Sequence, residues 1–426
     1  MLDLKWIRQN AEQVQTAADQ KGIRLSLEEL LLRDEKKRTL LHETEALREA
    51  RNKLSLQIGR LIKQGADGAA AQAKLQVTET NKKLEAAEAE LAIVDHQLAE
   101  LLLLVPNIVS PDTPVGRSDE DNVEVRKIGA PRSFGFEAKD HMALGELHDL
   151  IDIKRGVKAA GSRNYYLKGA GVMLHRAVQQ LALDMLVGKG FTPLDVPLMV
   201  RTEAMNSTGF FPLGEDQTYR ISNDDKWLVG TSEVPMVMYY ANEIVDAEAP
   251  IKLAAASTCF RSEVGSAGRD VHGLYRVHQF AKVEQVVLCQ ADPTLSEAIL
   301  QEITANAEEL LQLLELPYRV MAVCTGDMSQ KTYKQYDIET WMPSRESYGE
   351  THSSSNLHDF QARRSNIRYR TKEGTLKFCH TLNNTAVASP RILIPLLENH
   401  QCEDGAIRIP EALRPYLNGM ERLEAN

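Results

Sequence analysis

A seven-residue repeat of apolar side chains near the N-terminus constrains the fold more than any other feature of the sequence. Between Leu27 and Leu104 the chain has no proline and only three glycines, two of which lie in one break at residues 63–68. The repeat occupies both sides of this break, at Leu40, Leu47, Leu54 and Leu61, and then at Val77, Leu84, Leu91 and Leu98. This spacing gives each helix one apolar stripe, and a glycine-containing break lets two such helices fold back on each other. We therefore predict an antiparallel helical hairpin that extends roughly 55 Å, from about 38 residues per helix at 1.5 Å each.

A two-helix arm cannot enclose a large core, so it is expected to contact something else. The first helix, residues 27–64, holds nine Lys/Arg and seven Asp/Glu, a balance of +2, whereas the whole chain carries −10. This local excess is compatible with a polyanion partner, although solvated charged helix faces are common. A dimerisation coiled coil explains the periodicity equally well, and both interpretations stay open at this point.

The composition is that of a globular protein with two or three domains, because 426 residues include 43% hydrophobic and 26% charged ones. The five cysteines are at least 23 residues apart, so neither a disulfide scaffold nor a zinc cluster is expected. No apolar stretch in the first half approaches the roughly 20 residues of a membrane span. The first residues carry charges and no signal-peptide pattern, so we expect a cytoplasmic protein.

Three prolines between residues 105 and 114 interrupt helix and central strand alike, so we place a domain boundary here, between 1–105 and 106–426. Beyond it, β-branched runs at 283–288 and 318–323 predict strands, and 296–314 has helical apolar spacing. The chain contains neither GxGxxG nor GxxxxGK[ST], which disfavours the doubly wound nucleotide-binding folds. An α+β fold with an antiparallel sheet fits better.

The segment 259–284 is the richest in chemistry, with two strand-like runs around a glycine-rich loop at 265–273. Its charged residues include Arg261, Arg269, Arg276, Lys282, Glu263 and Glu284. Arginines with a nearby aromatic ring suit a nucleoside triphosphate. An exposed hairpin with salt bridges is the alternative.

Two further segments offer polar groups in short range. Residues 349–356 combine a carboxylate with hydroxyls, which suits Mg²⁺, or they form an ordinary polar loop. Residues 381–394 end in an apolar helix, and Arg391 near its N-terminus would deepen an anion site or face solvent.

Together these segments resemble class II aminoacyl-tRNA synthetases, and specifically the seryl-tRNA synthetase family. FRSE…GRD…GLYRVHQFAKVE is similar to motif 2, and TLNNTA…PRILIPLLENHQ to motif 3. Residues 230–233 (GTSE) resemble the serine-binding loop, and residues 190–197 resemble the motif 1 dimer element. ETHSSSN and FQARR (360–364) match the later catalytic strand, and the hairpin resembles the tRNA-binding arm. The resemblance spans essentially the whole chain. Residues 206–214 and the pair Val271-His272 differ from the sequence that is usual in the family at these places.

The resemblance implies an α+β class II antiparallel sheet flanked by helices, with an N-terminal antiparallel two-helix coiled-coil arm. Residues 1–105 would be the tRNA-binding domain and residues 106–426 the catalytic domain. The implied activity is serine–tRNA ligation with ATP and Mg²⁺ as cofactors and no zinc. The implied partners are L-serine, tRNA(Ser), tRNA(Sec) and a second copy in a homodimer, with no membrane.

The resemblance also implies roles for individual residues. Catalysis would fall to Arg261, Arg391 and Glu350, with Glu350 and Ser353 binding Mg²⁺. ATP binding would involve Arg261, Ser262, Glu263, Arg276, Phe280, Lys282, Glu350, Thr351, His352, Ser353 and Arg391. Serine binding would involve Thr231, Ser232, Glu233, Arg261, Glu284, Asn383 and Thr385.

Two other classes of function compete with this one. A ligase that loads an amino acid onto a carrier protein would be expected to lack the long arm. A non-catalytic paralogue would be expected to have lost charged ATP-site residues, which this chain keeps. The sequence therefore favours the tRNA ligase.

Overall fold

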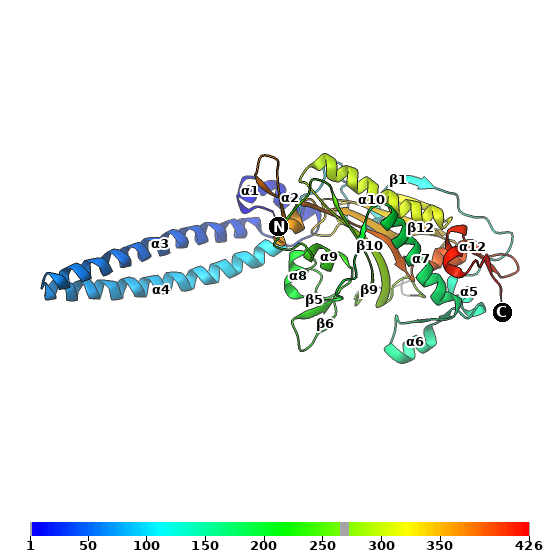
Figure 1. Ribbon diagram of the computed structural model, residues 1–426, viewed down its shortest axis with the longest axis horizontal. Coiled ribbons are helices and arrows are strands. Elements are labelled where there is room, and N and C mark those ends of the chain that lie inside the picture. Colours follow the sequence, from blue (N-terminus) through cyan, green and yellow to red (C-terminus); the bar gives the residue numbers. More distant parts are fainter. Residues whose placement is uncertain (1, 265–271, 426) are drawn as a thin grey trace. The chain divides into compact units, whose positions relative to one another are not determined.

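The computed structural model describes residues 2–264 and 272–425 (Figure 1). The chain divides into two compact units. One consists of Asp3–Asp19 and Ile23–Val105, and the other of Met1–Leu2, Gln20–Gly22 and Pro106–Asn426. The first is called the arm unit below, and the second the sheet unit.

The arm unit consists of helices, with α1 (Leu4–Gln9) and α2 (Ala11–Gln20) preceding two long ones, α3 (Leu27–Lys63) and α4 (Asp67–Leu104). The Ser26 side chain caps α3 by accepting a hydrogen bond from the Glu29 amide. All eight residues of the seven-residue repeat are buried or half-buried, with Leu98 at 1% exposure. Figure 1 shows α3 and α4 side by side along their length. The predicted antiparallel hairpin is thus confirmed.

The sheet unit is built on eight strands in the order β1-β11-β12-β13-β16-β10-β9-β4. Neighbours are antiparallel except β4 and β9, which run parallel. The strands are β1 (Val123–Ile128), β4 (Thr192–Pro193), β9 (Ile251–Phe260), β10 (Gln279–Cys289), β11 (Tyr318–Ala322), β12 (Lys334–Met342), β13 (Ser347–Asn356) and β16 (His380–Ser389). This confirms the predicted α+β class, and the strand expectations for 283–288 and 318–323 correspond to β10 and β11.

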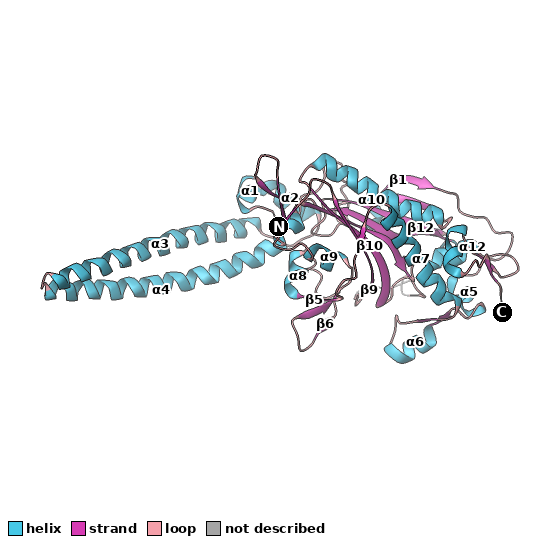
Figure 2. Ribbon diagram, in the orientation of Figure 1, coloured by secondary structure: helices cyan, strands magenta, loops and turns pink. Residues whose placement is uncertain are grey.

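Helices cover this sheet and complete its core (Figure 2). One cluster of buried side chains joins the strands to α7 (Ala170–Gly188), α10 (Pro293–Leu313) and α12 (Leu393–His400). Asp292 caps α10 by accepting a hydrogen bond of 2.8 Å from the Thr294 amide, and Pro293 occupies the first turn. The helix predicted at 296–314 is therefore present and begins one turn earlier.

Shorter elements surround this core. The helices are α5 (His141–Leu147), α6 (Ile153–Ala160), α8 (Thr202–Ser207), α9 (Glu233–Met238) and α11 (Phe360–Arg364), with 3₁₀ turns at Asp119–Asp121, Pro343–Arg345 and Glu411–Leu417. The strands are β2 (Ile151–Asp152), β3 (Tyr166–Leu167), β5 (Met199–Arg201), β6 (Arg220–Ile221), β7 (Lys226–Leu228), β8 (Ile244–Val245), β14 (Arg368–Arg370), β15 (Leu376–Phe378), β17 (Ile407–Arg408) and β18 (Arg422–Leu423). Of the helices described, none combines the length and apolarity needed to cross a membrane.

Candidate active site

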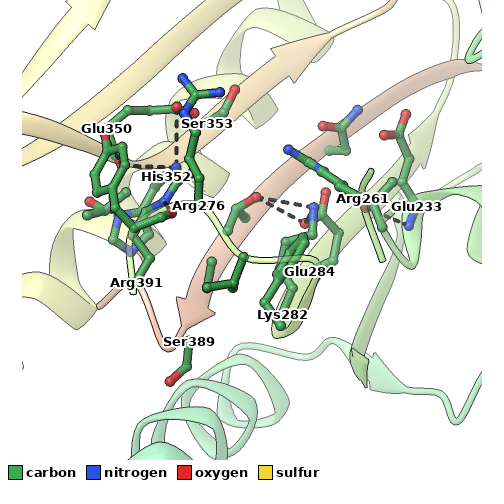
Figure 3. Close-up of a pocket in the computed structure, with 18 of the residues that line it drawn as sticks. Glu233, Arg261, Arg276, Lys282, Glu284, Glu350, His352, Ser353, Ser389 and Arg391 are labelled. Carbon is green, nitrogen blue, oxygen red and sulfur yellow. Dashed lines mark hydrogen bonds and ion pairs between the residues drawn. The ribbon is translucent and has the colours of Figure 1, made fainter. Parts of the chain in front are cut away.

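A cavity of about 340 Å³ opens in the sheet unit, lined by central strands and by the loops that follow them (Figure 3). Residues from β10, β13 and β16 line it, together with Arg261 after β9 and Arg391 before α12. Figure 3 shows two groups of side chains, one around Glu350 and Arg391 and the other around Arg261 and Glu284. The cavity therefore has two chemically different ends.

Strand β10 supplies one face of the cavity by simple alternation. Phe280, Lys282 and Glu284 lie two residues apart, so their side chains point to the same side of the sheet, and all three line the cavity. Glu284 is 1% exposed, and its carboxylate lies 2.7 Å from the Lys282 ammonium. The Thr385 hydroxyl also donates to it, over 3.2 Å. Burial raises the pKa of Glu284, and Lys282 opposes that rise.

A second buried carboxylate, Glu233, lies at the same end of the cavity. It begins α9, and its amide donates to the Thr231 hydroxyl over 3.2 Å. Its Oε1 atom accepts hydrogen bonds from the Lys331 ammonium at 2.6 Å and from the Gln361 amide at 2.7 Å. This end therefore presents two buried carboxylates, each paired with a lysine, which suits a small zwitterion with a polar side chain.

One donor at this end lacks a partner among the described residues. The Nδ2 atom of Asn383 on β16 is buried and makes no hydrogen bond within the part of the chain that the structure describes. Asn383 lines the cavity. Because an unsatisfied buried donor is costly, this amide is suited to a ligand oxygen.

The opposite end holds Arg391, fixed by neighbouring backbone. Its Nε donates to the Tyr275 carbonyl at 3.0 Å and its Nη1 to the Glu350 carbonyl at 3.1 Å. The guanidinium lies 4.4 Å from the centroid of the Tyr275 ring. Nearby, Arg276 lies 3.5 Å from the Glu263 carboxylate. Fixed guanidinium groups of this kind bind phosphate oxygens.

A β-bulge brings Glu350 and Ser353 to the same cavity. Residues three apart on a regular strand point to opposite faces. Strand β13 has one extra residue here, because His352 pairs with Ile338 while Glu350 pairs with Glu339. Both side chains consequently line the cavity. The segment 349–356, for which a polar loop was the alternative, is a strand.

The donor set at this bulge fits Mg²⁺. A carboxylate and a hydroxyl are oxygen ligands of the kind that Mg²⁺ takes, alongside waters and phosphate oxygens. The Glu350 side chain is 47% exposed, so it can reach such an ion. Across the described residues, no group of three or more His, Cys, Asp or Glu is arranged to hold a metal by protein ligands alone.

Arg261 follows the last residue of β9 and lies in the same group of side chains as Glu284 (Figure 3). Its amide donates to the His278 carbonyl at 3.0 Å, which ties the end of β9 to the start of β10. Its guanidinium lies 5.4 Å from the centroid of the Phe280 ring. A cation in this position is suited to an anionic group of a ligand bound in this part of the cavity.

The structure brings together nearly all of the residues that the sequence indicated. Ser232 and Ser262 are the exceptions, because they do not line the cavity. The Ser262 hydroxyl instead donates to the Asp216 carbonyl at 2.6 Å. Residues 265–271, which include Arg269 and most of the predicted glycine-rich loop with Val271, lie outside the described residues.

Sequence reasoning missed several residues of the lining, among them Phe210, Tyr275, Asp327, Lys331 and Gln335. Tyr275 stood inside the motif 2 segment and could have been included there. The others lie in or beside loops far from the recognised motifs, where no local pattern indicates a cavity.

The antiparallel sheet, with two separated arginines above a cavity of mixed charge, defines a class II aminoacyl-tRNA synthetase. Residues 218–400 match the model of the tRNA synthetase class II core domain (G, H, P, S and T). Residues 1–109 match the seryl-tRNA synthetase N-terminal domain.

Comparison with similar proteins identifies the family within this class. Serine–tRNA ligase from Deinococcus radiodurans is 46% identical over 99% of both chains, and that from Symbiobacterium thermophilum is 43% identical over 100% of both. The structure of seryl-tRNA synthetase from Pyrococcus horikoshii complexed with ATP superimposes with a TM-score of 0.91 at 38% identity, and each chain is covered completely. The cytoplasmic serine–tRNA ligase of Naegleria fowleri in complex with AMP gives 0.87 at 27% identity, covering 100% of this chain and 99% of that one. The chain belongs to the seryl-tRNA synthetase family.

Proposed function

We propose that this serine–tRNA ligase forms seryl-adenylate in the cavity of the sheet unit and then transfers the seryl group to tRNA. The observation that carries the proposal is the division of one cavity into an arginine-rich end and an end with two buried carboxylates. An aminoacyl-adenylate has the matching chemistry, because a phosphate joins a nucleoside to a small amino acid.

The nucleotide would occupy the end that contains Arg391. In this assignment Arg391 holds the γ-phosphate of a bent ATP, and Arg261 holds the α-phosphate. Phe280 stacks on the adenine opposite Arg391, and Glu263 accepts a hydrogen bond from the adenine amino group. The supporting feature is that Arg391 is anchored through Nε, by the Tyr275 carbonyl, and through Nη1, by the carbonyl and the carboxylate of Glu350. Its Nη2 makes no hydrogen bond within the described residues and can donate to a ligand.

Serine would occupy the end with the two carboxylates. Glu284 pairs with its ammonium group, and Thr231 and Glu233 complete the pocket. Asn383 and Thr385 lie at the hydroxyl end, where the unpartnered Asn383 Nδ2 can donate to the hydroxyl oxygen. A pocket with such groups rejects alanine, since its own polar atoms would stay unpaired. The extra methyl of threonine would be excluded by the enclosed space.

Magnesium would be held by Glu350 and Ser353, with Arg276 and Lys282 on the phosphate side. When bound, Mg²⁺ neutralises charge on the ATP phosphates. Thr351 and His352 lie between these two residues in the sequence and line the same cavity, which supports their assignment to ATP binding. Burial lowers the pKa of His352 to about 3, so this imidazole is neutral at physiological pH and contributes no positive charge to the phosphates.

Catalysis in this scheme needs no side-chain nucleophile. The serine carboxylate attacks the α-phosphorus, pyrophosphate leaves, and Arg261 stabilises the developing negative charge. The terminal ribose hydroxyl of tRNA then attacks the seryl carbonyl and AMP leaves. Rate acceleration comes from alignment of the reacting groups and from fixed positive charge around the phosphorus.

The partners are proposals of the same kind. Residues 1–105 form the tRNA-binding domain and residues 106–426 the catalytic domain, and the arm binds tRNA(Ser) and tRNA(Sec). Two copies associate through residues 190–197, which include β4 at the end of the eight-stranded sheet. The enzyme works in the cytoplasm. Exposed basic residues on α3, such as Lys53, Arg60 and Lys63, would meet RNA phosphates.

ATP–pyrophosphate exchange with each of the twenty amino acids tests the assignment. We expect exchange with serine and at most weak exchange with the others. Exchange that is absent with serine, or stronger with another amino acid, contradicts it. An aminoacylation assay then separates ligation to tRNA from loading of a carrier protein. The affinity for tRNA should also fall steeply as salt rises, because phosphate contacts release counterions.

A further inference from the structure

Lys331 is a buried cation at the carboxylate-rich end of the cavity, beside Glu233. Its side chain is buried, and the ammonium is 2.6 Å from Glu233 Oε1 and 3.7 Å from the centroid of the Phe210 ring. Burial lowers the pKa of Lys331, and the carboxylates of Glu233 and Glu284 oppose that shift. An ammonium placed at this depth persists only because it is paired.

The backbone that carries Lys331 is held in place although it forms no helix or strand. Residues 329–333 form the turn that precedes β12. Lys21 belongs to the sheet unit, and its ammonium donates to three backbone carbonyls of this turn. The side-chain amide of Asn107 donates to the backbone carbonyl of Lys331. The distances are 3.2 Å to Ser329, 3.2 Å to Gln330 and 2.5 Å to Thr332 from Lys21, and 3.1 Å to Lys331 from Asn107. The turn is therefore preorganised, and the Lys331 side chain is aimed before any ligand binds.

The Glu233 carboxylate is fixed from one side only. Lys331 and Gln361 both donate to Oε1, and Gln361 is itself held by the Thr208 carbonyl and the Thr381 hydroxyl. Within the part of the chain that the structure describes, no hydrogen bond is made to Oε2. Since Glu233 lines the cavity, this second oxygen is the one available to a substrate.

We propose that Lys331 is a specificity-determining residue, which fixes Glu233 as the acceptor for the serine hydroxyl and, with the Phe210 ring, limits the depth of the pocket. This inference rests on the proposed placement of serine between Glu284 and Glu233. The hydroxyl would donate to Glu233 Oε2 and accept from Asn383 Nδ2. Alanine would leave both groups unpaired, and a longer side chain would meet Phe210 and Lys331.

The test is the variant Lys331→Met, assayed by ATP–pyrophosphate exchange with serine and with alanine. We expect kcat/KM for serine to fall by about 100-fold, as for other buried pairs that lose one partner, while that for alanine changes by less than about 3-fold. KM for ATP should stay within about 2-fold, because Lys331 lies at the other end of the cavity from Arg391. A structural defect would lower kcat/KM for serine and for alanine by the same factor.

Lys334→Met is the matched control. Lys334 is also largely buried, and its ammonium pairs with Asp112 at 2.6 Å and Glu297 at 3.1 Å, but it does not line the cavity. The Lys334→Met variant should be less stable, but its ratio of kcat/KM for serine to kcat/KM for alanine should not change. Lys21→Met, which releases the turn but keeps the ion pair, should lower that ratio by about 5-fold if Lys331 acts through its position.

An unchanged serine-to-alanine ratio in Lys331→Met would overturn the inference. Glu284→Gln, measured in parallel, separates this failure from a wrong placement of serine. If only Glu284→Gln loses serine activation, the pocket is correctly placed and Lys331 does not set its specificity. If both variants keep it, the placement itself is wrong.

Discussion

Glu284→Gln removes one charge from the serine end of the cavity and leaves its shape nearly unchanged. Glu284 is 1% exposed and 2.7 Å from the Lys282 ammonium, so the variant loses a buried pairing and leaves Lys282 without its carboxylate. Breaking a buried ion pair costs about 3–5 kcal/mol, and the same carboxylate would otherwise meet the ammonium of serine. At about 1.4 kcal/mol per tenfold change, kcat/KM for serine should fall by roughly 10²- to 10³-fold or more.

Steady-state ATP–pyrophosphate exchange measures this effect at saturating ATP. KM for ATP should stay within about 2-fold, because the nucleotide is bound at the other end of the cavity. Glu308→Gln is the matched control, since Glu308 is a buried carboxylate on α10 that pairs with Arg126 outside the cavity. A fall of less than about 10-fold for Glu284→Gln, or an equal fall in Glu308→Gln, would refute the reasoning.

Three other predictions address the nucleotide, the pH dependence of stability and the arm. Arg391→Met should raise KM for ATP by about 10- to 100-fold, as expected for a lost charged hydrogen bond, with KM for serine unchanged; equal effects on both substrates would count against its assignment. Burial lowers the pKa of His380 from 6.5 to about 4, so the unfolded chain gains this proton first and stability is lost as pH falls below 6.5. At pH 5 this loss amounts to about 2 kcal/mol of unfolding free energy. In urea unfolding at pH 7 and pH 5, the His380→Phe variant should therefore lose about 2 kcal/mol less than the unmodified protein between the two pH values. An equal loss in both proteins would refute the pKa shift. Leu98→Ala, at a 1% exposed position, should destabilise the arm by about 2–5 kcal/mol and raise KM for tRNA but leave serine-dependent exchange intact; normal tRNA kinetics with a melted arm would exclude the arm from tRNA binding.

The sequence was sufficient where a pattern repeats or where chemistry is concentrated in a short segment. The seven-residue repeat through Leu40 and Leu98 predicted the hairpin because a helix converts that spacing directly into one buried stripe. The alternation of Phe280, Lys282 and Glu284 likewise places three polar or aromatic groups on one face once β10 is a strand.

Other parts of the site depend on details that no local pattern contains. Glu350 and Ser353 share a face only because of one extra residue in β13, and the sequence carries no mark of that bulge. Lys331 pairs with Glu233, which lies 98 positions earlier in the sequence. The turn that carries Lys331 is held by Lys21, a residue near the N-terminus. Such contacts follow from tertiary packing, so the sequence by itself could not predict them.

A crystal structure with a non-hydrolysable mimic of seryl-adenylate would show directly which side chains contact its phosphate, amino and hydroxyl groups. We expect the guanidinium of Arg261 to contact the phosphate position, Glu284 to contact the amino group, and Glu233 Oε2 to accept a hydrogen bond from the hydroxyl. A complex in which Arg261 and Glu284 point away from the bound ligand would contradict this expectation.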